Sequence, residues 1–423
     1  MPLAPSRPPR RFLAPALATL VLVALILAIA ARFAPWELAV GNVVLRSQRG
    51  TSLAFPTPAA GEPVMLDRGR PAAVASALAP RNAILMIGDG MGLGQVSTAS
   101  AVLHGPDGRL VMETATATGL VRTYSGNRLV TDSAAASSAM ATGFKTPNRT
   151  ISMIADGRTP VSLFEAARAV GLATGIVTTC GIIDATPAGF STHAAHRYDY
   201  PQIFEGLLAS GTEILIGGDS STNRRALRDD ELQDRLGSLD SLAKAAGYEL
   251  VRSSSELAAA SGRVLALYPP RAPRSNAHGP PLSESVTAAL RQLDGVGGGF
   301  ILLVESEMTD DSGHLNDAGG VVAAVRELDA AVAAALEWAE PRGDTLVLVT
   351  ADHDTGGLGV VAGEYSEGEA EIRWLSVNHT AHWVPLFAFG PGAEEFSGVI
   401  DNTEIGVRVA ELLGITGFPR IRP

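Results

Sequence analysis

Three short apolar runs in the chain each stop at a side chain of the kind that binds metals. The runs cover residues 83–88, 300–304 and 345–351, and Asp89, Glu305 and Asp352 follow them. Short runs rich in Val, Ile and Leu are typical of buried strands in a parallel sheet. Open α/β sheets bind ligands beyond the carboxyl ends of their strands. The pattern therefore predicts a cluster of metal ligands at one edge of a sheet.

Strand-like and helix-like stretches alternate from residue 81 onward. Strands are expected at 83–88, 174–179, 213–217, 263–268, 300–304, 345–350 and 384–389. Helices are expected at 92–103, 133–142, 161–170, 201–209, 239–246, 283–293, 318–339 and 403–413. Such alternation predicts an α/β fold, with a mostly parallel central sheet and helices on both faces.

The N-terminal part has a different pattern. Residues 12–31 carry no charge and follow three arginines. That stretch is long enough to span a bilayer as a helix, and the arginines place its start in the cytoplasm. We expect residues 1–35 to be a signal anchor in the inner membrane, with the protein on the extracytoplasmic (periplasmic) side. The alternative is a signal peptide cleaved near Ala28–Ala30, which would leave a secreted protein.

Residues 36–80, rich in Pro, Gly and Ala, are expected to form a tether with a short strand at 39–45, followed by a catalytic domain at 81–423. The 423 residues include 33 Lys and Arg against 44 Asp and Glu, a formal net charge of −11. This balance argues against nucleic acid as a specific partner, because phosphate backbones recruit clustered cations. Cys180 is the only cysteine, so no intramolecular disulfide can form; we expect it to be a small buried hydrophobe.

Ser133 precedes an alanine-rich run, which is strongly helix-forming. It would then lie at a helix N-terminus, where free backbone N–H groups favour an anion. An ordinary helix cap is the alternative. A serine hydroxyl becomes a good nucleophile only when a base or a metal activates it. Since no G-x-S-x-G sequence surrounds Ser133, a metal is the better candidate.

The candidate ligands fall into two chemical classes. Aspartate with histidine suits zinc, and the candidates are Asp310, His314, Asp352, His353 and His379. Oxygen donors alone suit magnesium, and the candidates are Asp89, Thr186 and Glu305. Each candidate ligand alone is a weak signal, but the joint position of these residues at predicted strand ends indicates a metal cluster.

Six segments give the chain a resemblance to bacterial alkaline phosphatases, which are phosphomonoesterases with two zinc ions and one magnesium ion. They are IGDGMG (87–92), TDSAAASSAMATGFKT (131–146), DATPAGFSTHAAHR (184–197), VESEMTDDSGH (304–314), TADHD (350–354) and HTAHWVPLFAFGP (379–391). The segments follow the family's order and span most of residues 81–415.

The resemblance implies a role for each matching residue. Ser133 would be the nucleophile that is transiently phosphorylated, and Arg197 would clamp two phosphate oxygens. One zinc would be held by Asp310, His314 and His379, and the other by Asp89, Asp352, His353 and Ser133. Magnesium would be held by Asp89, Thr186 and Glu305, with Asp184 orienting its bound water. The substrates would be small phosphate monoesters, and because relatives are dimeric a homodimer is also considered.

One departure and two alternatives accompany this interpretation. Asp311 stands where some relatives have Lys or His, which puts phosphate affinity in question. A phosphodiesterase or sulfatase of the same superfamily is one alternative, although residues 133–137 lack the C/S-x-P-x-R context of sulfatases. The other is a catalytically silent, metal-binding domain tethered to the membrane.

Overall fold

A computed structural model describes residues 36–40, 43–47, 79–105, 108–219, 234, 239–269, 279–364 and 369–422. The predicted anchor at 12–31 lies outside these residues. Among the described helices, none combines the length and apolar composition needed to cross a bilayer. The single strand expected at 39–45 is wrong: the structure has an antiparallel hairpin of β1 (Trp36–Val40) and β2 (Val43–Ser47).

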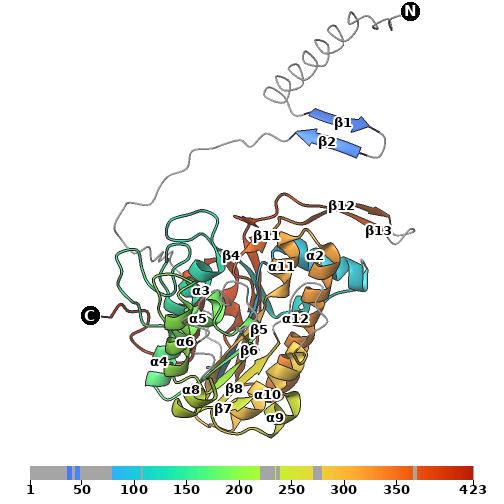
Figure 1. Ribbon diagram of the computed structural model, residues 1–423. Helices are drawn as coiled ribbons and strands as arrows, with labels where there is room; N and C mark the ends of the chain where they lie inside the picture. Colours follow the sequence, from blue (N-terminus) through green and yellow to red (C-terminus); the bar gives the residue numbers. More distant parts are fainter. Residues whose placement is uncertain are drawn as a thin grey trace, which may run out of the picture. The chain divides into compact units, whose positions relative to one another are not determined.

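A ten-stranded sheet forms the centre of the unit that follows (Figure 1). In spatial order its strands are β16 (Gly398–Asp401), β4 (Ala117–Arg122), β15 (Val384–Phe389), β10 (Thr345–Thr350), β3 (Asn82–Gly88), β9 (Phe300–Ser306), β5 (Ala173–Gly181), β6 (Ile214–Gly218), β8 (Val264–Tyr268) and β7 (Glu249–Val251). Only β15 runs antiparallel to its neighbours. The prediction of a mostly parallel sheet is confirmed.

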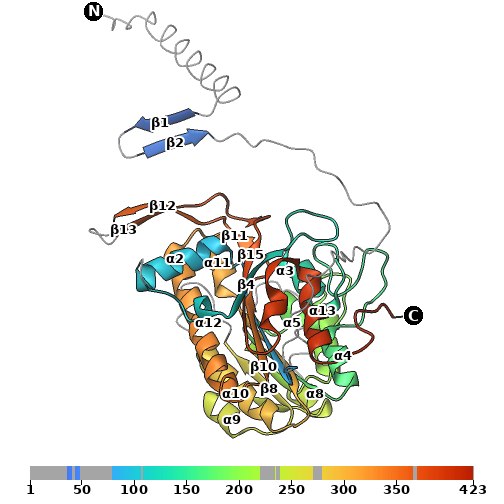
Figure 2. The same cartoon turned by 180° about the vertical axis from the view of Figure 1, so that it is seen from behind.

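Helices cover both faces of this sheet, as the two opposite views show (Figures 1 and 2). On one face lie α2 (Leu93–His104), α9 (Ser254–Ala259), α10 (Leu282–Asp294), α11 (Met308–His314) and α12 (Ala318–Ala339). On the other lie α3 (Ser133–Thr142), α4 (Leu163–Ala169), α5 (Ala185–Ser191), α6 (Tyr200–Ala209), α8 (Leu239–Ala245) and α13 (Asn402–Leu412). Because both faces are covered, all seven residues of β3 are buried, which explains its continuous apolar run.

The helix that begins at Ser133 packs unusually closely. All ten residues of α3 are buried, and most of them are Ala or Ser. Its neighbours contribute glycines at the contact points. A Cβ on Gly189 of α5 would lie 2.6 Å from the Ser137 hydroxyl, and one on Gly406 of α13 would lie 2.1 Å from the Met140 carbonyl oxygen. Small side chains therefore fix the position of α3, and with it the position of Ser133.

A buried ion pair ties the loop after α3 to the start of α13. The Lys145 ammonium lies 2.9 Å from the Asp401 carboxylate and donates to Asn402 Oδ1 at 2.7 Å. Both charged side chains are 3% exposed. Burial lowers the pKa of Lys145 to about 8, although Asp401 opposes this shift. The ammonium still carries its charge at neutral pH, so the pair holds the end of α3 against α13.

Replacing Lys145 by Met should destabilise the fold by about 3–5 kcal/mol, because the Asp401 carboxylate would stay buried without its cation. Denaturant unfolding at pH 7 measures this change. The exposed Lys244 on α8 provides the matched control, and Lys244→Met should change the free energy of unfolding by less than about 0.5 kcal/mol. Equal stability of the two variants would show that the buried pair has no structural importance.

Candidate active site

The three apolar runs lie side by side, because β10, β3 and β9 are neighbours in the sheet. Their carboxyl ends therefore bring Asp89, Glu305 and Asp352 to one edge. Gly90 makes the tight turn after Asp89 possible, with φ at +70°, and a Cβ there would lie 2.8 Å from the Cα of Asp310. Its backbone N–H donates to Asp352 at 3.1 Å.

The first group of candidate ligands consists of Asp89, Asp352 and His353. Their ligating atoms lie within 4.8 Å of one another, and all three side chains are buried. His353 Nε2 lies 3.4 Å from Asp89 and 3.2 Å from Asp352. One carboxylate oxygen on each aspartate is buried without a hydrogen-bond partner. A buried polar atom of this kind is costly unless something else compensates it.

The second group consists of Asp310, His314 and His379. His314 is one helical turn after Asp310 on α11, and its Nε2 lies 3.2 Å from the carboxylate. His379, in the short strand β14 (His379–Thr380), has its Nε2 3.5 Å from Asp310. Backbone carbonyls hold the other ring nitrogens: His314 Nδ1 donates to Val377 at 2.6 Å and His379 Nδ1 donates to Thr131 at 2.9 Å. Both Nε2 atoms are thereby left free to bind a metal.

His353 joins these two groups. Its ring stacks on that of His379, with 3.6 Å between centroids. Burial and the nearby His379 lower its pKa well below the usual value, so the ring is neutral and able to act as a ligand. Thr355 contacts His353 Nδ1 at 3.2 Å and donates to the Asp310 carboxylate.

The third group surrounds Glu305. Its carboxylate accepts from Thr178 at 2.6 Å and contacts the Cys180 thiol at 3.2 Å. Thr186 is 1% exposed, and its hydroxyl has no hydrogen-bond partner among the described residues. Cys180 is buried as expected, but in polar surroundings. Burial and Glu305 raise its pKa, which keeps the thiol protonated.

Glu307 is a further acid that the sequence analysis missed. It lies with Cys180 and Glu305 in a group whose ligating atoms are within 4.8 Å. It follows β9 directly and precedes α11, so its nearness to the strand end was the available signal. Burial and Glu305 raise its pKa well above the usual value.

Seven carboxylates gather at this edge, and repulsion between neighbours helps to raise the pKa values of several of them. They are Asp89, Asp184, Glu305, Glu307, Asp310, Asp311 and Asp352. Burial, together with neighbouring acids, raises the pKa of Asp89 and of Asp352 well above the usual value. Asp310 differs: burial raises its pKa, but the hydrogen bond from His314 and the other two histidines lower it more. Divalent cations would compensate this charge, so the residues present fit a metal cluster.

Ser133 lies beside these groups. Its Oγ is 3.4 Å from His353 Nε2. Asp132 caps α3 by accepting from Ala135 N–H at 3.0 Å. Arg197 lies 3.0 Å from Asp184 and 3.5 Å from Asp132. Burial lowers the pKa of Arg197, but the two carboxylates raise it more, so the guanidinium stays charged.

Two residues close in sequence to the candidate ligands lie apart from the groups. Asp354 is buried and accepts from the Gly357 N–H at 3.1 Å. It therefore acts as a structural residue at the strand end. His382, the sequence neighbour of His379, points to Asp354 at 3.6 Å and is 56% exposed. Asp311, by contrast, faces the site. Burial, then Asp310 and Asp184, raise its pKa to about 6.

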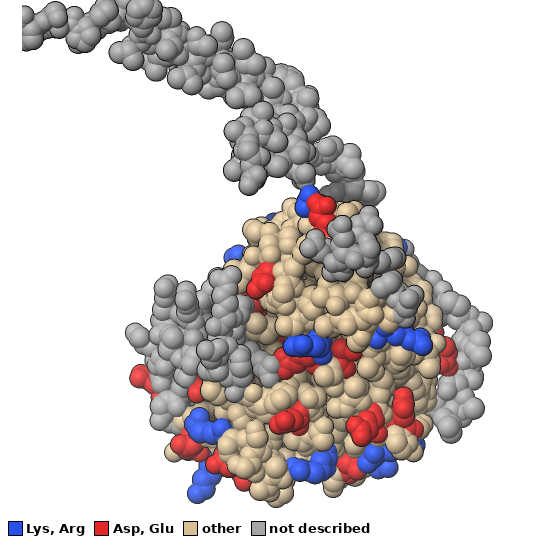
Figure 3. Space-filling view, turned by 90° about the vertical axis from the view of Figure 1, so that its right-hand side faces the viewer, with Lys and Arg blue, Asp and Glu red and all other residues tan. Residues whose placement is uncertain are grey.

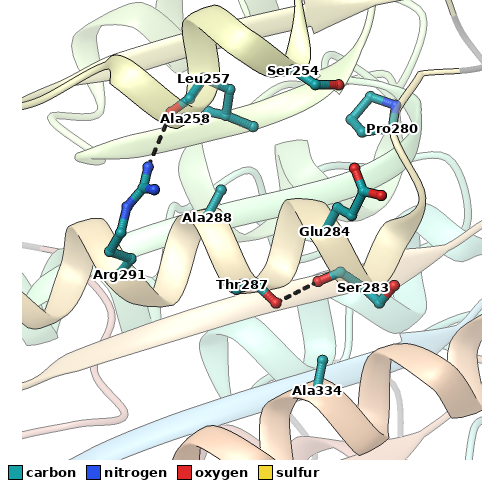
Figure 4. A pocket seen from close by; sticks show the side chains of 10 residues that line it. All are labelled: Ser254, Leu257, Ala258, Pro280, Ser283, Glu284, Thr287, Ala288, Arg291 and Ala334. Atoms are coloured by element: carbon teal, nitrogen blue, oxygen red, sulfur yellow. Dashed lines mark hydrogen bonds between the residues drawn. The ribbon is translucent and has the colours of Figure 1, made fainter.

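A cavity of about 570 Å³ opens beside the second group, and His314, His379 and Asp132 contribute to its lining. Another cavity, of about 390 Å³, lies between α9 and α10 (Figure 4). There Arg291 donates to the Leu257 carbonyl at 3.3 Å, and no residue of the three ligand groups takes part. Of these two cavities, the first therefore adjoins the candidate ligands.

Comparison with known proteins agrees with this arrangement. The family model for alkaline phosphatase matches residues 80–368. The chain belongs to the alkaline phosphatase family. A streptomycin-6-phosphate phosphatase of Streptomyces griseus is 34% identical over 409 residues, covering 79% of this chain and 91% of the relative. Alkaline phosphatase 4 of Bacillus subtilis is 29% identical over 408 residues, covering 77% of this chain and 87% of the relative.

Solved structures of the family superpose on the same part of the chain. Alkaline phosphatase from the Antarctic bacterium TAB5 is 28% identical, with a TM-score of 0.69 over 80% of this chain and 98% of that chain. A mutant of the same enzyme with Mg bound in its M3 site gives a TM-score of 0.70 at 29% identity, over 80% and 99% of the two chains. The protein is a phosphomonoesterase, as its sequence led us to expect.

The metal-free protein should become less stable as the pH rises from 6.5 to 9. The hydrogen bond to Asp310 raises the pKa of His314 to about 9. This hydrogen bond therefore contributes its full stabilisation below about pH 6.5, the pKa of histidine in the unfolded chain. The stabilisation is lost as the pH rises through 9. The buried acids with raised pKa values act in the same direction. Thermal unfolding in excess chelator at pH 6, 7.5 and 9.5 measures the effect.

His314→Gln should make that pH profile flatter, whereas His104→Gln, at an exposed position of α2, should preserve it. If the thermal unfolding midpoint of the parent protein rose between pH 6.5 and 9, this account of the His314–Asp310 ion pair would be contradicted.

Proposed function

We propose that the protein hydrolyses phosphate monoesters through a phosphoserine at Ser133, in a site that binds two zinc ions and one magnesium ion. The observation that carries this proposal is the position of Ser133 Oγ, 3.4 Å from His353. His353 belongs to one ligand group and stacks on a residue of the next. The nucleophile thus lies where two groups of zinc-type donors meet.

The donor chemistry distinguishes the three metal positions. Asp310, His314 and His379, whose side chains approach one another, would hold one zinc. Asp89, Asp352 and His353 would hold the other, because both sets mix imidazole with carboxylate. Magnesium would take oxygen ligands from Asp89, Thr186 and Glu305, with Asp184 nearby. The bound metals would supply charge stabilisation for the attacking and leaving oxygens.

The chain itself supplies the phosphate site. The N-terminus of α3 presents free backbone N–H groups beside Ser133. Arg197 offers a planar fork of donors that suits two phosphate oxygens. Asp184 and Asp132 hold that fork in place, at 3.0 and 3.5 Å. Ser133 attacks phosphorus, the alcohol leaves, and water then releases phosphate from the serine in the second half of the reaction.

The same arrangement bears on the phosphodiesterase alternative. A monoester has a third non-bridging oxygen, which a diester lacks, and Arg197 gives this site a fixed cation to meet the added charge. We therefore expect monoester turnover to exceed diester turnover. A ratio of diester to monoester turnover above one would favour the alternative.

The location and assembly of the protein are proposed from sequence and resemblance. Residues 12–31 would anchor it in the inner membrane, with the catalytic unit on the periplasmic side. Retention in membranes after alkaline carbonate extraction supports an anchor, and release into the soluble fraction contradicts it. A homodimer would be visible by light scattering of the purified protein.

Ser133→Ala should lower turnover of an aryl phosphate by about a thousandfold or more, because nothing else can form the covalent intermediate. Its zinc and magnesium content should stay close to that of the parent. Acid quenching of the parent during turnover should yield a phosphorylated peptide containing Ser133.

Ser137→Ala is the matched control, one turn further along α3, where the hydroxyl contacts only backbone carbonyls at 3.2 and 3.1 Å. It should keep most of the activity. A fully active Ser133→Ala variant would exclude the nucleophile role.

A further inference from the structure

The cavity beside the proposed zinc ligands has a distinctive lining. It has a volume of about 570 Å³ and is lined by Asn127, Arg128, Val130, Thr131, Asp132, Asn148, Arg149, His314, Asn378 and His379. One wall is thus made by two of the proposed metal ligands and another by the cap residue of α3. Ser133 lies against His353, so in an in-line displacement the alcohol would leave on the side of the other proposed zinc ligands, His314 and His379. The cavity is therefore where the leaving group would lie.

Two arginines in this lining have no carboxylate partner. Neither the Arg128 nor the Arg149 guanidinium makes a hydrogen bond or ion pair to any residue that the structure describes; only their backbone atoms are bonded, as where Arg149 N–H donates to Asp132. Arg342, by contrast, is paired with Asp294 at 3.1 Å. The only carboxylate in the lining, Asp132, already accepts from Ala135 N–H and lies 3.5 Å from Arg197.

The excess of cations is local. The whole chain has a net charge of −11, and on the face in Figure 3 Lys and Arg side chains lie scattered among Asp and Glu. The two arginines thus belong to a chain whose net charge is negative. An unpaired guanidinium presents a fork of donors that matches carboxylate or phosphate.

Arg149 has a second unusual property. Its φ is +69°, a left-handed conformation that is strained for a residue with a side chain but that glycine adopts freely. The position is fixed from both sides: Arg149 N–H donates to Asp132 at 3.0 Å, and its carbonyl accepts from Arg197 N–H at 2.8 Å. Glycine would satisfy the backbone here at lower conformational cost. An arginine side chain at this place points to a use for its charge.

From these observations we infer that the cavity selects phosphate monoesters whose leaving group carries a second anionic group, such as a carboxylate or another phosphate, which Arg128 and Arg149 bind. This inference rests on the proposed function, because that function places the leaving group in the cavity. The rim lies partly in water, so each arginine should contribute a modest selectivity, about two- to fivefold.

The test uses three phenyl phosphates that differ only at the meta position: carboxymethyl, hydroxyethyl and trimethylammoniomethyl. Initial rates at 20 mM ionic strength give kcat/KM for each. The parent should prefer the carboxymethyl ester over the hydroxyethyl ester by about fivefold or more, and should disfavour the cationic ester. Raising the ionic strength to 0.5 M should shrink these ratios, since exposed charges are screened.

Arg128→Gln and Arg149→Gly should each lower the ratio of carboxymethyl to hydroxyethyl ester, and the double variant should bring it close to one. Arg149→Gly should also unfold at an equal or higher temperature than the parent, because it relieves the strained φ. Arg342→Gln, whose partner Asp294 lies outside this cavity, is the control and should keep the parent's ratio.

The outcomes separate this inference from the proposed function. Hydrolysis of all three esters without an anion preference, or a preference that both variants keep, would overturn the inference and leave the phosphatase function intact. Hydrolysis of none of the three would overturn the proposed function, and the inference with it.

Discussion

Repulsion among seven carboxylates at one sheet edge is the constraint on which the site depends. Desolvation alone would favour their protonation, and their proximity adds to that penalty. The pKa values of Asp89, Glu307 and Asp352 are raised for these reasons. Three histidines and Arg197 cannot balance so many acids by themselves. Multivalent cations would balance them, and in the proposed site the mixed and the oxygen-donor ligand sets would each suit one kind of cation.

A rigid frame is needed to hold these groups together. The buried strands β10, β3 and β9 supply it, because parallel strands covered on both faces end at fixed positions. Ser133, the proposed nucleophile, comes from the other side, on a helix whose small residues let it approach α5 and α13 closely. Lys145 and Asp401 then fix the far end of that helix. The edge of the sheet and the start of α3 thus meet at His353, which contacts both.

Much of this could be predicted from the sequence because each signal was local. Apolar runs marked the central strands within a residue or two, and the run from 318 to 339 marked α12 correctly. Three strands of the sheet were missed. β7 and β16 have three and four residues, too few for a periodic pattern, and the six residues of β4 are mostly half-buried and form no continuous apolar run. The hairpin β1–β2 was mistaken for one strand because the apolar residues at 39–40 and 43–45 were taken as a single run, although Gly41 and Asn42 interrupt it.

Sequence motifs identified the site residues, but they did not predict the contacts between them. Nothing local indicates that Arg149 adopts a left-handed conformation, or that its backbone links Asp132 to Arg197. The partner carbonyls of His314 and His379 lie 63 and 248 residues away in sequence. Glu307 escaped notice because the family motif draws attention to Glu305 alone. These contacts arise from tertiary packing between segments that are far apart in the sequence, so no local sequence pattern predicts them.

The most direct test of a metal cluster at this edge is elemental analysis combined with a phosphatase assay on the same preparation. The account predicts two zinc ions and one magnesium ion per chain, loss of activity in chelator, and recovery when both metals are returned. Full aryl phosphate turnover by protein that holds less than one equivalent of metal would contradict it.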